Sequence, residues 1–528
     1  MTDVPTPSPA AGPAPDSAAK AKSSRTSTLI VVGILAALLM GALDQFVVLT
    51  ALKYIVVDLG DPNGITFVIS AYLISSTVAI PIFGKLSDLL SRRNVFLLGL
   101  GIFIGGSLLS GLSQNLDELI AFRAIQGFGN GGFFPVGISI VAVIFPPETR
   151  ARLIGLLSGV FGIATVAGPL LGSFIVDHAS WRWVFYVNIP VGLLGIAILV
   201  LTLGPLRPTE KRTFDVPGAA LLAGWVGPLM YALIQVSKTN PWAWTDLRTI
   251  GLLVATVVLF VGFLVWELRA REPLVPIRLL SRRVVAGSGG TAFLVGFAVF
   301  SLTAFISVLV SFVLLPAGLS AADVVRDVLY AQVVPIVFGA AIGGQLLTRV
   351  SYRALTATGA LISAAGFVFL TTTTLSTPLW VFYGGFLPVG GIVLPLIPIG
   401  FGAGMTLPVF ILAVQNEVAT ADVGAASGLV QFLQSLGASM GVSLLAVFLQ
   451  WRLTALRPAG TFADPSYATA VLRSTVQAYD QLFTVMLGLL LLTFLVSLLL
   501  VGRLPRGKPA GSALADAPAV AASADSPP

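Results

Sequence analysis

A run of 24 residues near the N-terminus most constrains what this chain can fold into. Residues 29–52 read LIVVGILAALLMGALDQFVVLTAL and carry one charged side chain, Asp44. At ~1.5 Å per residue, a helix of this length crosses a bilayer core of ~30 Å. Similar apolar runs recur along the whole chain, which is only 10% charged, whereas soluble domains are about 25% charged. The sequence therefore predicts an all-α membrane protein with many spans.

The apolar runs and the loops between them predict fourteen membrane spans. An even number places both termini on the same side. Most of the 30 basic residues lie in the two tails and in the loops that face them, so both termini are expected in the cytoplasm of a multi-pass cell (inner) membrane protein. We place the spans at residues 29–52, 64–83, 95–113, 119–144, 152–176, 183–203, 216–236, 249–268, 284–315, 328–348, 354–374, 392–415, 424–449 and 481–502.

A short internal repeat suggests how these spans are organised. Residues 84–93 read GKLSDLLSRR and residues 344–353 read GQLLTRVSYR, and each stretch follows an apolar run. Two six-span halves in the same orientation, with two spans inserted between them, would explain the repeat. The predicted units are a disordered tail (1–27), an N-terminal bundle (28–203), a linker of two spans with a basic loop (204–283), a C-terminal bundle (284–502) and a second disordered tail (503–528).

The apolar segment 379–394 is harder to place, because its four glycines and one proline interrupt it. We expect a hairpin or an amphipathic piece on the outer side of the membrane. If the segment instead crossed the bilayer, the span count would become fifteen and the C-terminus would lie outside.

Composition excludes several classes of function. The net charge of +7 comes from loop residues, which indicates membrane orientation rather than nucleic-acid binding. The chain has no cysteine and one histidine, so neither a thiolate nor a histidine metal site is expected, and no cofactor is predicted. No Gly-x4-Gly-Lys-Ser/Thr pattern is present, so energy from nucleotide hydrolysis in this chain is not expected.

Asp44 is the first candidate for function. It lies in the far half of its span, where a charged carboxylate costs at least ~2.5 kcal/mol by insertion scales. A low dielectric disfavours its ionised form, so a buried acid of this kind suits proton-coupled transport. The alternative is a structural carboxyl that neighbouring helices hold without any role in turnover.

The fourth predicted span carries a polar stripe. Arg123, Gln126, Gly127 and Asn130 are spaced i, i+3, i+4 and i+7, and therefore share one helix face. We expect Arg123 to act in the proton cycle by holding a carboxylate or a water network, and Gln126 and Asn130 to line a substrate cavity. The alternative is an arginine that reaches the interface from near its helix end.

Two further segments are candidates for conformational change. In the loop at 84–93, Gly84, Asp88, Arg92 and Arg93 could form a cytoplasmic gate, although a solvated inside loop would have the same composition. The fifth span is rich in small residues that favour close helix packing, and its proline should kink it. Its residues of interest are Gly159, Gly168, Pro169 and Gly172.

Five stretches, taken together, resemble signatures of the major facilitator superfamily. Residues 84–93, 123–129 and 168–172 are similar to its loop, fourth-span and antiporter motifs, and residues 43–50 and 181–192 resemble the fourteen-span drug:proton antiporter branch. Leu49 and Lys53 stand where asparagine and proline are usual, and the Val-Val-x-Thr sequence at residues 47–50 is similar to that of exporters that also move lipids. The resemblance implies two six-helix bundles plus two linker helices, with Asp44 and Arg123 in proton coupling and the fifth span favouring antiport.

The leading hypothesis is a proton-driven exporter of lipophilic, amphipathic or cationic small molecules, working as a monomer by alternating access. The first alternative is export of lipids or lipid-linked molecules to the cell envelope, which the charge-free segment 379–394 favours. A distant alternative is an intramembrane transferase enzyme, for which only Asp58 and Asp61 have a suggestive spacing.

Overall fold

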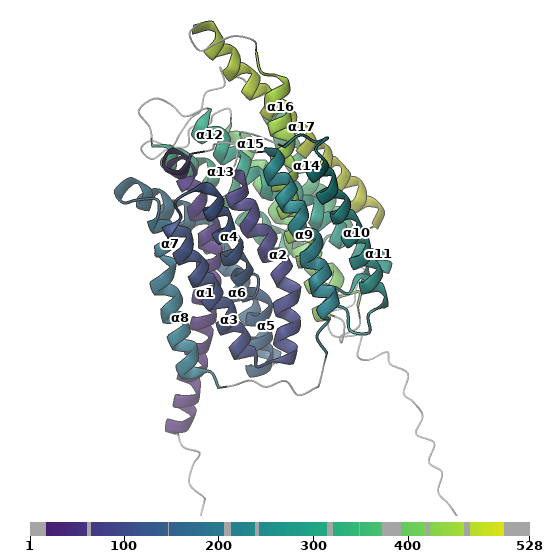
Figure 1. Cartoon of the computed structure of the whole chain (residues 1–528). Helices are drawn as coiled ribbons and strands as arrows, with labels where there is room; N and C mark the ends of the chain where they lie inside the picture. The colour runs from purple at the N-terminus through teal and green to yellow at the C-terminus, as the bar shows by residue number, and fades with distance from the viewer. Residues whose placement is uncertain are drawn as a thin grey trace, which may run out of the picture.

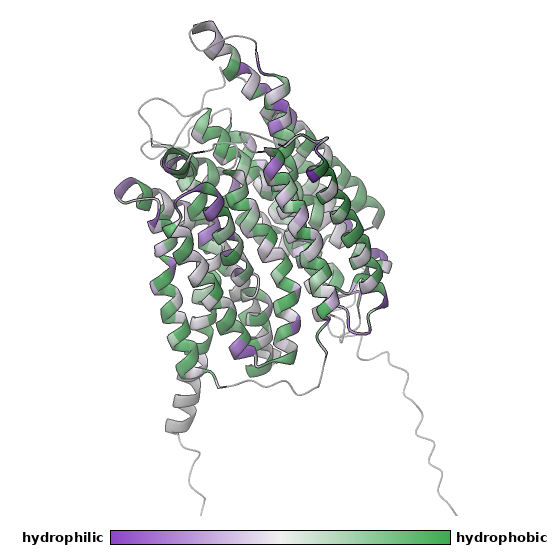
Figure 2. Ribbon diagram, in the orientation of Figure 1, coloured by the Kyte–Doolittle hydropathy of each residue, from purple (hydrophilic) through white to green (hydrophobic). Residues whose placement is uncertain are grey.

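The computed structural model describes residues 17–60, 65–145, 147–204, 213–237, 242–313, 320–347, 349–371, 392–418, 423–458 and 465–500. Within these ranges every regular element is a helix, and the long helices run side by side as one bundle (Figure 1). Hydrophobic residues predominate along the length of these helices (Figure 2). The prediction of an all-α membrane protein is confirmed.

The described residues of the N-terminal half form eight helices. The fourth predicted span, 119–144, is two helices, because the regular hydrogen bonding is interrupted by a turn at Gly131 and Gly132, where glycine weakens a helix. The helices are α1 (Ser17–Leu59), α2 (Thr66–Leu89), α3 (Arg92–Leu112), α4 (Leu116–Asn130), α5 (Phe133–Ile144), α6 (Pro147–His178), α7 (Trp183–Tyr186) and α8 (Asn188–Thr202). Because α1 begins at Ser17, residues 17–27 of the predicted disordered tail continue the first helix.

A linker hairpin and the C-terminal half follow. The linker helices α9 (Val216–Ser237) and α10 (Leu247–Arg269) pack against each other. The ninth predicted span contains a π-helical turn, η2, between two α-helices. The remaining elements are η1 (Ile277–Ser281), α11 (Arg283–Val295), η2 (Gly296–Phe300), α12 (Ser301–Phe312), α13 (Ala321–Leu346), α14 (Tyr352–Leu370), α15 (Val393–Gln415), α16 (Val423–Ala455) and α17 (Pro465–Leu500).

Each of the fourteen predicted spans contains a helix in its described residues, but not all of these helices meet the length and hydropathy expected of a crossing. Twelve helices in the described part of the chain are long and apolar enough to cross a membrane. The other two predicted spans correspond to the broken pair α4–α5 and to α6. The count of fourteen therefore stays a prediction. Most of the segment 379–394 and the tail 503–528 lie outside the described residues.

The internal repeat is visible in how the helices pack. Helices α3 and α14 begin 260 residues apart, which is the offset of the sequence repeat. A Cβ on Gly99 of α3 would lie 3.1 Å from the carbonyl oxygen of Gly129, and one on Gly359 of α14 would lie 2.6 Å from that of Gly402. Both halves thus contain the same close helix pair, in which a glycine lies at the contact between the two backbones.

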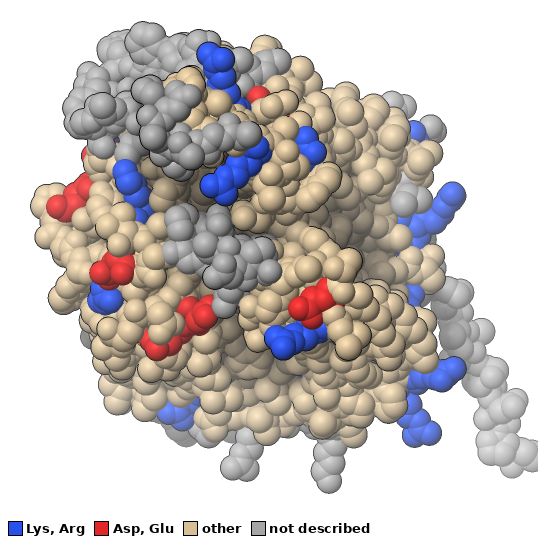
Figure 3. Space-filling view, turned by 45° about the horizontal axis from the view of Figure 1, so that its top comes forward, with Lys and Arg blue, Asp and Glu red and all other residues tan. Residues whose placement is uncertain are grey.

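The two halves contact each other through corresponding helices. Helix α2 packs against α16, and α13 packs against α6. In the order of the repeat, α2 corresponds to α13, and α6 corresponds to α16. The α2–α16 contact is therefore the counterpart of the α13–α6 contact, as expected for two halves related by symmetry. The lower part of the face seen in Figure 3 shows few charged residues, which fits burial of that surface in lipid.

Candidate functional site

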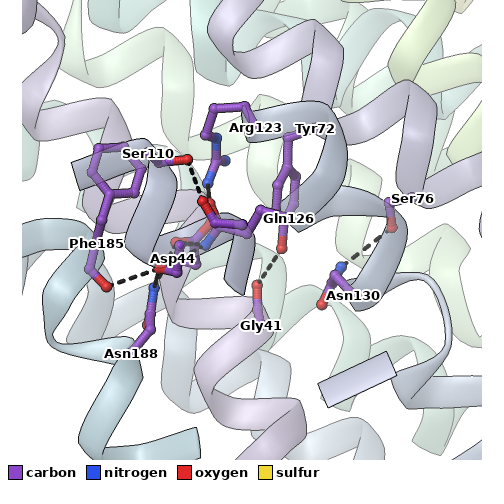
Figure 4. Close-up of polar contacts among 12 residues, drawn as sticks. Gly41, Asp44, Tyr72, Ser76, Ser110, Arg123, Gln126, Asn130, Phe185 and Asn188 are labelled. Carbon is purple, nitrogen blue, oxygen red and sulfur yellow. Dashed lines mark hydrogen bonds and ion pairs between the residues drawn. The ribbon is translucent and has the colours of Figure 1, made fainter. Parts of the chain in front are cut away.

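The buried acid of the first helix is the centre of a polar cluster. The Asp44 side chain has no solvent exposure. Its Oδ2 accepts a hydrogen bond from Arg123 Nη1 at 2.5 Å, and its Oδ1 accepts hydrogen bonds from Gln126 Nε2 at 2.9 Å and Asn188 Nδ2 at 2.8 Å (Figure 4). Three donors from α4 and α8 therefore converge on one carboxylate of α1 and join the three helices at this point.

Arg123 is as buried as its partner, with 2% of the residue exposed. Its guanidinium lies 4.0 Å from the centre of the Tyr72 ring and also donates to Gln126 Oε1 at 2.8 Å. The Tyr72 hydroxyl donates to the carbonyl oxygen of Gly41 at 3.1 Å, which fixes the ring under the cation. A buried ion pair is tolerated only when its remaining polar atoms are also bonded, and this cluster meets most of that need.

Two members of the cluster were not among the predicted site residues. Asn188 opens α8, and Ser107 lies on α3. The Ser107 hydroxyl accepts hydrogen bonds from Gln126 and Asn188, each at 3.1 Å, and donates to the carbonyl oxygen of Phe185 at 2.8 Å. Asn188 belongs to the motif at residues 181–192. It lies 144 positions from Asp44 along the chain, so the sequence alone does not predict their contact.

The predicted cavity residues lie in different surroundings. Gln126 is fully buried within the Asp44 cluster. Asn130, one helical turn further along α4, donates to Ser76 Oγ of α2 at 3.3 Å and stands apart from the carboxylate (Figure 4). The structure brings Arg123 and Gln126 to Asp44 and leaves Asn130 at the contact between α2 and α4.

The predicted gate residues contact neighbouring helices of their own half. Arg92 Nε donates to Ser139 Oγ at 2.7 Å, and Arg93 Nη2 donates to the carbonyl oxygen of Val200 at 3.0 Å. No other residue lies within 4 Å of the position a Cβ on Gly84 would take, so this backbone is open on that side. The Asp88 side chain lies outside the described residues.

The predicted antiporter helix packs closely on α1, near the buried acid. A Cβ on Gly168 would lie 2.6 Å from Cβ of Phe46, and one on Gly172 would lie 2.2 Å from Thr50 Oγ1. Pro169 lies between them, inside α6. The surroundings of Gly159 lie outside the described residues. Glycine at 168 and 172 therefore lets α6 approach the segment of α1 that follows Asp44.

The end of the bundle where α1 finishes joins the two halves. Asp177 Oδ1 of α6 accepts hydrogen bonds from the Tyr54 hydroxyl at 3.1 Å and from Ser320 Oγ at 2.8 Å, and Ser320 directly precedes α13. Further along the same contact, the Tyr330 hydroxyl of α13 donates to the carbonyl oxygen of Val166 at 2.8 Å. We call this contact between α6 and α13 the far-end junction.

A cavity of about 510 Å³ opens beside the far-end junction. Asp58 lies at its wall, where it accepts hydrogen bonds from Arg182 Nη1 at 2.5 Å and Trp181 Nε1 at 3.0 Å. Lys53 and Ser320 also line the cavity. In the part of the chain that the structure describes, no group of three or more His, Cys, Asp or Glu side chains could hold a metal ion.

These features agree with comparisons to known proteins. Residues 34–442 match the model of the Major Facilitator Superfamily, which is most of the chain. The chain belongs to the major facilitator superfamily. A bacterial homologue of the human lysosomal transporter Spinster, solved in an inward-facing and unoccupied conformation, has the same fold with a TM-score of 0.61 and 14% identity; the match covers 89% of this chain and 97% of that one.

Curated members of the superfamily are similar over most of the sequence. Multidrug resistance protein 3 of Bacillus subtilis is 33% identical over 425 residues, which is 80% of each chain. A triacylglyceride transporter of Mycolicibacterium hassiacum is 31% identical over 495 residues, covering 88% of this chain and 90% of that one. This major facilitator protein is thus a transporter and not an enzyme, as the sequence predicted.

Proposed function

We propose that this protein is a proton-coupled antiporter that exports lipophilic or amphipathic compounds from the cytoplasm by alternating access. The buried contact between Asp44 and Arg123 is the observation that carries the proposal. The proton site must lie where ionisation changes helix packing, and this carboxylate joins α1 to α4 and α8. Protonation would remove its charge and release the arginine from its ionic partner.

The position of α1 supports a link between the proton site and the two halves. The same helix contacts α6 of its own half and α12 and α13 of the other half. A shift of α1 on protonation would therefore reach the far-end junction through Tyr54. With both termini in the cytoplasm, the joined far end would be external, and the structure would correspond to an outward-closed conformation.

The proposed substrate class rests on the relatives and on composition. One relative is named for multidrug resistance and another for triacylglyceride transport, and both names point to substrates that partition into lipid. The chain is 56% hydrophobic, and small-molecule sites in proteins are lined mostly by apolar side chains. We propose lipophilic or cationic drugs as the first class, a monomer as the working unit, and the cell (inner) membrane as its location.

Export of lipids is the second candidate function. The triacylglyceride transporter covers a larger share of this chain than the multidrug protein does. Proteoliposomes loaded with a fluorescent triacylglyceride and, separately, with a lipophilic cationic dye would distinguish the two classes. Faster gradient-driven movement of the triacylglyceride favours lipid export, and faster movement of the dye favours drug efflux.

The coupling is tested by transport of the dye in proteoliposomes with and without an imposed pH gradient. We expect the gradient to accelerate transport by the wild type and to have no effect on the variant Asp44→Asn, because an amide takes up no proton at these pH values. Asp117→Asn, which changes an exposed acid in the first turn of α4, is the matched control and should respond as the wild type does. A gradient response in Asp44→Asn would refute the coupling role.

A further inference from the structure

A second pair of buried acids lies far from Asp44, at the base of the linker hairpin. Asp215 directly precedes α9, and Glu267 lies in the last turn of α10. Glu267 has no solvent exposure, and Asp215 is 9% exposed. In Figure 1 the start of α9 lies at the lower end of the bundle, where α8 also ends. Neither residue has a role in the proton site described above.

Each of these carboxyl groups uses one oxygen and leaves the other without a partner. Asp215 Oδ1 accepts hydrogen bonds from Gly218 N at 2.9 Å and Trp266 Nε1 at 2.7 Å. Glu267 Oε2 accepts one from Val275 N at 3.2 Å. Among the described residues, Asp215 Oδ2 and Glu267 Oε1 are buried and have no hydrogen-bond partner. Capping of the start of α9 thus accounts for the hydrogen bonding of Asp215 Oδ1 but not for the burial of Asp215 Oδ2.

The two unpartnered oxygens face the same small space. The position that a Cβ on Gly218 would take lies 2.4 Å from Asp215 Oδ2 and 2.9 Å from Glu267 Oε1. Two ionised carboxylates this close, in a buried place, repel each other, and each also lacks the hydrogen bonds it would make in water. A proton on either oxygen would remove one of the two charges and supply a donor for the other oxygen.

We propose that Asp215 and Glu267 form a second proton-binding site, in which the two carboxyl groups share one proton. A metal ion fits less well, since the described part of the chain brings together no group of three or more His, Cys, Asp or Glu side chains. The shared proton holds the start of α9 against the end of α10. Its loss leaves two like charges that push the base of the hairpin apart.

The charged groups around this site connect it to the segment 84–93. Lys85 Nζ of α2 donates to Glu272 Oε2 at 2.9 Å, and Thr213 N donates to the same oxygen at 3.1 Å. Lys85 is also close enough for its charge to act on Glu267. Arg278 is exposed and donates to backbone carbonyls at the end of α10, and α16, which packs on α9, has no charged residue before Arg452. The site therefore lies where the linker is tied to α2.

Infrared difference spectroscopy of the full-length protein in liposomes, stepped in pH, tests the shared proton directly. We use the Asp44→Asn background, so the result does not depend on the proposed function. The expected result is a buried protonated-carboxyl band that disappears as the pH is raised. It should be lost in Glu267→Gln and in Asp215→Asn and retained in Asp117→Asn, which changes an exposed acid of α4. A band that persists unchanged in both variants, or no such band in the background protein, overturns the proposal.

A transport measurement then asks what the site does, and this arm rests on the proposed function. In the wild type, dye export should fall as the cytoplasmic-side pH rises through the titration of the pair. Glu267→Gln stays neutral and can donate its amide to Asp215, so its export should lose this alkaline fall. Export that falls equally in both proteins shows that the pair does not act on transport. Because the spectroscopy needs no transport, failure of the proposed function would be recognised separately.

Discussion

At the scale of single residues, the site depends on which side chains donate hydrogen bonds to Asp44. Its carboxylate accepts from Arg123, Gln126 and Asn188, and a hydrogen bond to a charged group contributes about 1.5–3 kcal/mol. Each donor therefore helps to hold α1 against α4 and α8. The asparagine is the least obvious of the three, because it begins a different helix and carries no charge.

Removing this asparagine should loosen the cluster. In Asn188→Leu, the buried Asp44 carboxylate and the Ser107 hydroxyl each lose a hydrogen bond that leucine cannot replace. Because a hydrogen bond to a charged group contributes about 1.5–3 kcal/mol, we expect a lower melting temperature and slower gradient-driven transport. Thermal unfolding and the proteoliposome assay check this, and a variant that keeps the wild-type melting temperature would contradict it.

The aromatic ring beneath Arg123 offers a second test at this scale. The guanidinium lies 4.0 Å from the centre of the Tyr72 ring, where such contacts contribute about 0.5–2 kcal/mol. Tyr72→Leu should lower the melting temperature and slow transport, whereas Tyr72→Phe keeps the ring and should lose only the hydrogen bond to Gly41. Equal losses in both variants would show that the ring itself does not hold the arginine.

Sequence reasoning recognised the residues of the site but could not pair them. Asp44 was predicted because an acid in an apolar run is rare, and Arg123 because it opens a polar stripe. The two residues lie 79 positions apart in the chain and on different helices, so no local sequence pattern predicts their contact. Ser107 and Asn188 are neutral residues among many, and only burial beside the carboxylate distinguishes them.

At the scale of helices, close packing between α1 and α6 depends on two glycines. At Gly172 a side chain would meet Thr50 Oγ1 at 2.2 Å and the carbonyl oxygen of Val47 at 2.8 Å. The backbone of α1 cannot yield as a flexible side chain would, so α6 would have to move away.

We therefore expect Gly172→Val to destabilise the protein by about 1–3 kcal/mol, as overpacking usually does. Thermal unfolding of the purified protein in detergent measures the change. Gly101→Ala is the matched control, because nothing lies within 4 Å of its Cβ position, and alanine in a helix is favoured over glycine by up to about 1 kcal/mol. If the Gly172→Val variant has the melting temperature of the wild type, the close contact is ruled out.

The sequence predicted where helices lie better than how they bend. Apolar length is a local property, and each of the fourteen predicted segments contains a helix. The break at Gly131 and Gly132 was missed because the apolar run continues through it. The π-helical turn at Gly296–Phe300 was missed as well, since it depends on how this helix packs against α16.

At the scale of the whole molecule, the far-end junction should open and close during transport. The chain has no cysteine, so a pair introduced at this junction is the only thiol pair present. Asp177 and Ser320 suit the test, because Ser320 Oγ donates to Asp177 Oδ1 at 2.8 Å.

In the double variant Asp177→Cys with Ser320→Cys, oxidation should form a disulfide and stop dye transport, and a reductant should restore it. Gel mobility after proteolysis measures the link, and the proteoliposome assay measures the transport. The single variants, treated in the same way, control for oxidation elsewhere. Full transport by the cross-linked protein would show that the two helices need not separate.

The complete burial of the Asp44 side chain bears on how well the resting membrane holds its proton gradient. A carboxylate that bulk water cannot reach gives hydrogen ions no continuous route across the bilayer while the transporter is idle. Under the proposed mechanism, protons would then cross the membrane through this protein only when a substrate is transported. Substitutions that admit water beside this residue should be recognised in growing cells by a leak that harms them even when no drug is present.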